Sequence, residues 1–163
     1  MKTQAILNKI EELKRTLEAA GIGVKFDSKL APKREQTFKH WFREEVPSDG
    51  LSRKSGIYIF SDENDEILYI GKAASNNLGS EIYSKFSAAT DFNSEGFPLF
   101  KKNNIAKYSP LDKPELAQSF ISGDILITVV EIEKKECTSL VEVFLQTFCA
   151  LSEGLPPLNK QIG

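Results

Sequence analysis

Two short apolar segments enclose a polar run near the middle of the chain. Both are rich in residues that favour strands, and a glycine stands at the start of the first, Gly56, and at the end of the second, Gly71. Residues 61 to 66 between them are all Ser, Asp, Glu or Asn and are too polar to pack. This pattern predicts a β-hairpin over residues 56 to 71.

The predicted hairpin has one apolar face and one face that carries tyrosines. A turn centred between Glu63 and Asn64 pairs residues whose numbers add to 127, which sets Tyr58 opposite Tyr69. Side chains alternate along a strand, so the other face receives an apolar set, namely Ile57, Ile59, Leu68 and Ile70. A tyrosine pair on a strand is typical of cross-strand aromatic packing, so the pair alone indicates no chemistry.

Three periodic stretches predict helices. The first begins at Thr3, which we expect to cap it, and ends near Gly21; the second runs from Leu78 to Ala88; the third opens at residues 138 and 139 and ends before Gly154. The apolar stripe of the first helix must cover its own domain or a second copy of the chain, because a lone helix of this length is marginal in water. We expect it to pack on its own domain.

The fold class follows from these elements. Asp124 to Ile132 has the composition of a buried central strand. With the hairpin it predicts an α+β fold, in which a small three-stranded antiparallel sheet is flanked by helices. We divide the chain into a helical N-terminal extension, residues 1 to 53, and a domain of residues 54 to 163. Within that domain, residues 90 to 119 are expected to be an insertion with a role in specificity.

The composition is that of an ordinary soluble globular protein. The chain has 163 residues, of which 40% are hydrophobic and 27% charged. A net charge of −2 and a pI near 5.6 count against attraction of nucleic acid by the overall charge of the protein. Local clusters of Lys and Arg can still contact phosphates. No apolar run reaches the length of a membrane span, so we expect a cytoplasmic protein with no membrane partner.

The two apolar segments of the hairpin carry a specific signature. Residues 56 to 58 read Gly-Ile-Tyr, and after ten residues 69 to 71 read Tyr-Ile-Gly, which resembles the paired triplets of the GIY-YIG nuclease superfamily. Residues 77 and 78, Asn-Leu, resemble the start of that family's first helix, and residues 156 to 159, Pro-Pro-Leu-Asn, resemble its closing Pro-x-x-Asn. The resemblance covers roughly residues 54 to 162 and implies the GIY-YIG fold.

The resemblance also implies a function. Members of the family are hydrolases that cut DNA with the help of a single divalent cation, Mg²⁺ or Mn²⁺. The compact form of this chain is closest to the restriction-enzyme branch, and an enzyme of that kind that cuts both strands is often a homodimer. By this resemblance Tyr58 helps to activate the attacking water, Tyr69 and Lys72 orient it or bind phosphate, and Glu142 on the last helix holds the cation.

One position departs from the family. Where the family has a catalytic arginine on the first helix this chain has Glu81, and no arginine follows Arg53. A carboxylate in place of a guanidinium repels phosphate and should cost several kcal/mol of transition-state stabilisation in a poorly solvated site. We therefore expect an impaired or inactive endonuclease, whether Glu81 is native or introduced. The alternative is a degenerate GIY-YIG domain that binds nucleic acid or protein without catalysis.

The cation ligand has competing interpretations. Glu142 is followed at three residues by Leu145, as in the family's Glu-x-x-Leu, but Ser139 to Glu142 also reads as a helix capping box. Counting back from Pro156 reaches Gln146 instead, whose amide is a weaker ligand for a hard cation. We favour Glu142. The single histidine, His40, and Lys85 on the second helix are further candidates for the site.

Overall fold

The computed structural model describes residues 1–22, 26–31, 53–86, 91–92, 98–99 and 125–163. His40 lies outside these residues, and so does nearly all of the predicted insertion.

A four-stranded antiparallel sheet forms the centre of the described structure. Its strand order is β1-β6-β2-β3, with β1 at Phe26–Ala31, β2 at Gly56–Ser61, β3 at Ile67–Ala73 and β6 at Leu126–Ile132. The α+β class and the three predicted strands are confirmed. The sheet has one strand more than predicted, because β1 pairs with β6 from Phe26 opposite Ile132 to Ala31 opposite Ile127. A separate two-stranded sheet joins β4, Asp91–Phe92, to β5, Pro98–Leu99.

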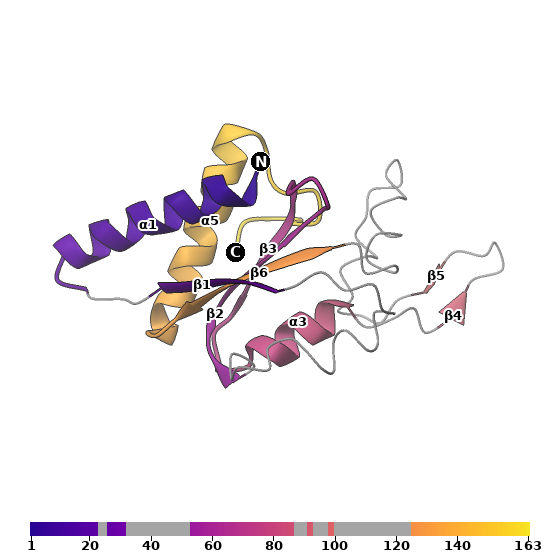
Figure 1. The fold of residues 1–163 in the computed structure, drawn as a ribbon, viewed down its shortest axis with the longest axis horizontal. Coiled ribbons are helices and arrows are strands. Elements are labelled where there is room, and N and C mark those ends of the chain that lie inside the picture. Colours follow the sequence, from indigo (N-terminus) through magenta and orange to yellow (C-terminus); the bar gives the residue numbers. More distant parts are fainter. Residues whose placement is uncertain (23–25, 32–52, 87–90, 93–97, 100–124) are drawn as a thin grey trace.

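Helices cover both faces of the main sheet. α1 (Thr3–Ala19) and α5 (Thr138–Ser152) lie over one face, and α3 (Leu78–Phe86) lies over the other (Figure 1). A short 3-10 turn, η3 (Lys135–Cys137), leads into α5. Figure 1 also shows the N-terminal helix crossing over α5 instead of projecting away from the sheet.

The core lies between the sheet and the α1–α5 layer. One cluster of buried side chains joins α1, α5, the hairpin and β6: Ile6, Ile10, Leu17, Ile57, Ile59, Ile67, Ile70, Val130, Ile132, Val141, Leu145 and Cys149. The expectation that the first helix packs on its own domain is therefore confirmed. The division at residue 53 stays a prediction, but α1 and β1 share the core and sheet of the residues that follow it.

Thr3 does not cap the first helix, which corrects the prediction. The residue before the helix is Lys2, and Thr3 is already helical, with its hydroxyl buried and without a partner among the described residues. The reason is tertiary. The Thr3 N–H donates to the carbonyl of Asp65 in the hairpin turn at 3.3 Å, and the Ile67 N–H donates to the carbonyl of Met1 at 2.9 Å. The hairpin thus supplies the acceptor that a capping side chain would have supplied.

The hairpin register differs from the prediction by two residues. Tyr58 stands opposite Gly71 and Phe60 opposite Tyr69, with a shift of register between Phe60 and Ser61. The turn adds one residue, because Asp65 takes a positive φ of 65° and the Asp62 carboxylate accepts the N–H groups of the turn. The bulge adds the second. Beyond the bulge the shift is even, so both tyrosines still share one face of the sheet. Nearer the turn the shift is one residue, so Ile67, and not Leu68 as predicted, joins Ile57, Ile59 and Ile70 in the core cluster.

Candidate active site

The two tyrosines lie on the face of the hairpin that α3 covers. The ring centroids of Tyr58 and Tyr69 are 6.0 Å apart. Phe60 packs beside both, at 5.3 Å from Tyr58 and 5.8 Å from Tyr69, so the three rings form one aromatic cluster. The sequence analysis did not place Phe60 in this cluster, although Phe60 lies two residues after Tyr58 and therefore on the same face of the strand.

Gly71 provides the space that the tyrosine rings occupy. A Cβ added there would lie 2.5 Å from Cζ of Tyr58 and 2.6 Å from Cε1 of Tyr69, too close for any side chain. The glycine of the first triplet is also required, since a Cβ on Gly56 would collide with the backbone carbonyl of Val130 on β6. Both glycines of the paired triplets are therefore explained by packing alone.

Tyr58 is held as a neutral phenol. Its side chain is 1% exposed, and its pKa lies well above the ordinary value of 10.0, first because burial disfavours the phenolate. The neighbouring Tyr69 and the carboxylates of Glu81 and Glu142 raise that pKa further. At neutral pH the Tyr58 hydroxyl is therefore a hydrogen-bond donor, and the negative charge of both glutamates reaches it.

Glu142 forms an ion pair that joins α5 to the hairpin. Its Oε2 accepts a hydrogen bond from Nζ of Lys72 at 2.6 Å, and the two side chains are 7% and 33% exposed. The capping-box interpretation is wrong. η3 runs directly into α5, so the residue before the helix is Cys137, Ser139 is already helical, and no side chain caps the first turn. The carboxylate is thus directed to Lys72 and not to the end of its own helix.

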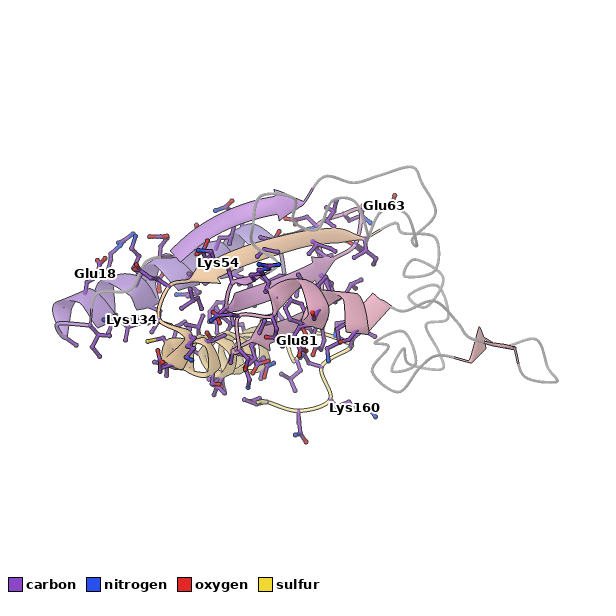
Figure 2. All side chains as sticks on the ribbon, turned by 90° about the horizontal axis from the view of Figure 1, so that it is seen from below. Glu18, Lys54, Glu63, Glu81, Lys134 and Lys160 are labelled. Carbon is purple, nitrogen blue, oxygen red and sulfur yellow. The ribbon has the colours of Figure 1, made fainter. Side chains whose placement is uncertain are left out.

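Glu81 occupies the arginine position in a geometry that suits an acid. It lies in the first turn of α3, visible on the side of the sheet nearest the viewer in Figure 2, where the helix dipole favours negative charge. Its Oε1 accepts a hydrogen bond from Nδ2 of Asn77 at 3.1 Å. Sequence reasoning did not find this partner, although an Asn directly before a helix and four residues ahead of a Glu is a detectable signal.

Gln146 has a structural part. Its Nε2 donates to the carbonyl of Ile70 at 3.1 Å, and its Oε1 accepts the N–H of Gly163 at 2.7 Å. Asn159 completes this arrangement, because its amide both donates to the Ile70 carbonyl and accepts the Ile70 N–H, each at 2.9 Å. β3 is an edge strand of the sheet. The closing motif therefore pairs with the outer edge of β3, and the Gln146 amide is already engaged.

The cation that the resemblance implies can be tested against these residues. Among the described residues no group of three or more His, Cys, Asp or Glu side chains could hold a metal ion. Mg²⁺, however, is often bound by one or two carboxylates, completed by water and substrate phosphate. Glu142 fits such a site, since it is a buried carboxylate whose partner is already a cation.

The remaining candidates stand apart from this group. Lys85 lies in the last turn of α3, where the helix dipole favours a basic side chain. A cavity of about 420 Å³ opens near the turn of the hairpin and is lined by Glu66, Leu68, Glu153 and neighbouring residues, none of them a predicted site residue. No described helix has both the length and the apolar character needed to cross a membrane.

The structure thus associates Tyr58 with Tyr69, Glu81 and Glu142, and Glu142 with Lys72. Lys72 and the two tyrosines lie on opposite faces of the hairpin, since side chains alternate along β3 and Tyr58 on β2 pairs with Gly71. No family model, no curated protein and no solved structure matches the chain.

Proposed function

We propose that the chain is a divalent-cation-dependent DNA endonuclease of the GIY-YIG type, and that the carboxylate of Glu81 slows its reaction. The observation that carries the proposal is the partly buried Lys72–Glu142 pair, whose carboxylate acts electrostatically on the buried Tyr58 of the first triplet. DNA is the proposed partner in the cytoplasm, and two copies of the chain would cut the two strands.

Phosphodiester hydrolysis needs an oriented water and positive charge beside the phosphate. Tyr58 stays protonated and donates its hydroxyl hydrogen to Tyr69, and its hydroxyl oxygen would orient the attacking water by accepting a hydrogen from it. Lys72 supplies one positive charge, and Glu142, its partner in the ion pair, would hold Mg²⁺ or Mn²⁺. A divalent cation bound there would supply further positive charge and lower the pKa of a bound water.

Glu81 opposes this reaction. The carboxylates of Glu81 and Glu142 both act on Tyr58, while Lys72 pairs with Glu142, so the three charged groups together are negative and repel a phosphate in the absence of a cation. Glu81 also helps to raise the pKa of Tyr58, which lowers the fraction of phenolate that could act as a base at neutral pH. An arginine at position 81 would reverse both effects.

Cleavage of supercoiled plasmid DNA in Mg²⁺ or Mn²⁺ tests the proposal. The protein, Glu81→Arg and the double variant Glu81→Arg with Tyr58→Phe are compared side by side. We expect Glu81→Arg to cut at least about tenfold faster than the protein, equivalent to about 1.4 kcal/mol, and Tyr58→Phe to abolish that gain. Cleavage that is independent of both positions would contradict the proposal.

A second function is favoured by one observation. The hydrogen bond from Asn77 and the helix dipole stabilise Glu81 where it stands, so the carboxylate is part of the fold of α3. This suits a domain that binds nucleic acid or protein without catalysis. If neither the protein nor Glu81→Arg cuts DNA while both are folded and bind it, the binding function replaces the nuclease.

A further inference from the structure

We propose that the ammonium of Lys72 and the divalent cation compete for the same carboxylate, Glu142, so that the cation must displace Lys72 in order to bind. This inference rests on the proposed function, because a cation at Glu142 is part of it. It adds that the Lys72 ammonium already occupies the Glu142 carboxylate. This competition lowers the apparent affinity of the site for the metal ion.

The first step of the argument is the burial of Glu142. Its side chain is 7% exposed, and Lys72 is its one hydrogen-bonding partner among the described residues. Val141 and Leu145 beside it on α5 are fully buried, and Gln146 one turn further is engaged with Ile70 and Gly163. A carboxylate in such surroundings is strongly destabilising unless a positive charge accompanies it. Lys72 therefore neutralises Glu142 whenever no metal ion is present.

The second step is that two cations cannot share this carboxylate without cost. Nζ of Lys72 lies 2.6 Å from Oε2, the distance of a short charge-assisted hydrogen bond. A divalent cation coordinates a carboxylate oxygen at a similar or shorter distance, and the ammonium beside it would repel it at low local dielectric. Binding of the cation thus requires the ammonium to move away.

The third step is that Lys72 is able to leave. Its side chain is 33% exposed, and its flexible stem lets the ammonium reach water, where it is strongly hydrated. Once released, the Lys72 ammonium is a positive charge that can contact an anionic group. No arginine after Arg53 supplies such a charge. Lys54, by comparison, is paired with Glu131 at 3.0 Å.

Calorimetric titration of the full chain with Mn²⁺ tests the exchange. Lys72→Met removes the competitor, and Lys72→Gln removes its charge but keeps a donor for Glu142. Lys54→Met is the matched control, because it removes the same charge from a different ion pair, near the start of β2 (Figure 2). Both Lys72 variants should bind Mn²⁺ about tenfold more tightly than the protein, and Lys54→Met should bind it as the protein does.

A thermal unfolding scan with and without Mn²⁺ supplies a second readout. The unpaired Glu142 of Lys72→Met should lower its melting temperature in EDTA, and saturating Mn²⁺ should restore it by a larger shift than in the protein. The larger shift is expected because the ion then replaces a missing positive charge. Should Lys72→Met not fold in EDTA, folding on addition of Mn²⁺ gives the same result.

The outcomes separate this inference from the proposed function. If both Lys72 variants bind Mn²⁺ no more tightly than Lys54→Met, the competition is disproved, while cation binding at Glu142 stands as long as Glu142→Gln abolishes it. If Glu142→Gln binds Mn²⁺ as well as the protein does, the cation lies elsewhere. That result overturns both the exchange and the cation site of the proposed function.

Discussion

The two faces of the β2–β3 hairpin are built in different ways. The face toward α1 and α5 is closed by aliphatic side chains, and the charged pair Lys72–Glu142 joins β3 to α5 there. The face toward α3 is filled by three aromatic rings, of which the two tyrosines carry hydroxyl groups. Each face departs from simple packing at the same end of the hairpin. At that end Tyr58 pairs with Gly71 on the face toward α3, and Ile57 pairs with Lys72 on the face toward α5.

The substitution with the largest expected effect disrupts the packing of the hairpin face toward α3. Gly71→Ala places a methyl group 2.5 to 2.6 Å from both tyrosine rings, and should lower the free energy of unfolding by about 3 kcal/mol as measured by urea denaturation. Tyr58→Leu in the same chain relieves part of the collision, so the double variant should lose less than the sum of the two single losses. Additive losses would show that the rings do not depend on Gly71.

The next effect isolates the charged pair on the α5 face. Lys72→Met leaves the buried Glu142 carboxylate unpaired and should cost about 2 kcal/mol of unfolding free energy in EDTA, less than a fully buried pair because Lys72 is partly exposed. Adding Glu142→Leu should restore stability to that of the protein or above, since an apolar pair suits this face. A double variant less stable than Lys72→Met would show that the pair is needed for the fold.

A pH series compares one buried acid from each face. Burial raises the pKa of the Cys149 thiol from 9.0 to about 11, and that of Tyr58 well above 10.0. A group whose pKa is raised on folding binds its proton more tightly in the folded state, so its contribution is full below the unfolded pKa and is lost as pH rises. The free energy of unfolding should fall by roughly 1 to 2 kcal/mol between pH 9 and 10.5.

Urea denaturation of Cys149→Ala at both pH values is the control for that series. The part of the loss that begins at pH 9 should disappear with the thiol, and the part that begins near pH 10 should remain because Tyr58 is unchanged. An unaltered loss in Cys149→Ala would assign the whole effect to other groups.

The smallest expected effect concerns Glu81. Glu81→Gln keeps an acceptor for Asn77 and removes only a partly exposed charge from the first turn of α3. The free energy of unfolding should therefore change by less than about 0.5 kcal/mol, in contrast to the loss at Lys72. Circular dichroism during urea denaturation measures it. A loss above about 1 kcal/mol would mean that the charge of Glu81 is part of what holds α3 in place.

The sequence predicted those features that depend on local pattern. Except at Leu68, beside the bulge, the faces of the hairpin were predictable because the alternation survives an even change of register, whereas the register itself depends on the positive φ of Asp65 and on that bulge. β1 was missed because residues 26 to 31 alternate too weakly to predict a strand, and its pairing with β6 supplies the stability.

The same limit applies to the site. The triplets marked Tyr58 and Tyr69, but the sequence allowed three interpretations of the last helix. Only a partner 70 residues away, Lys72, distinguishes the ion pair of Glu142 from a helix cap. Likewise the engagement of Gln146 depends on Ile70, 76 residues distant. Contacts of this range are set by packing of the whole sheet and leave no mark in local sequence.

The most direct test of the account is the dependence of DNA cleavage on Glu142. Nicking of supercoiled plasmid in Mn²⁺ is compared for Glu81→Arg and for Glu81→Arg combined with Glu142→Gln, a change that keeps the shape of the side chain and removes its charge. The account predicts cleavage by the first and a loss on the order of 100-fold or more in the second. Equal cleavage by both, or none by either folded protein, would contradict it.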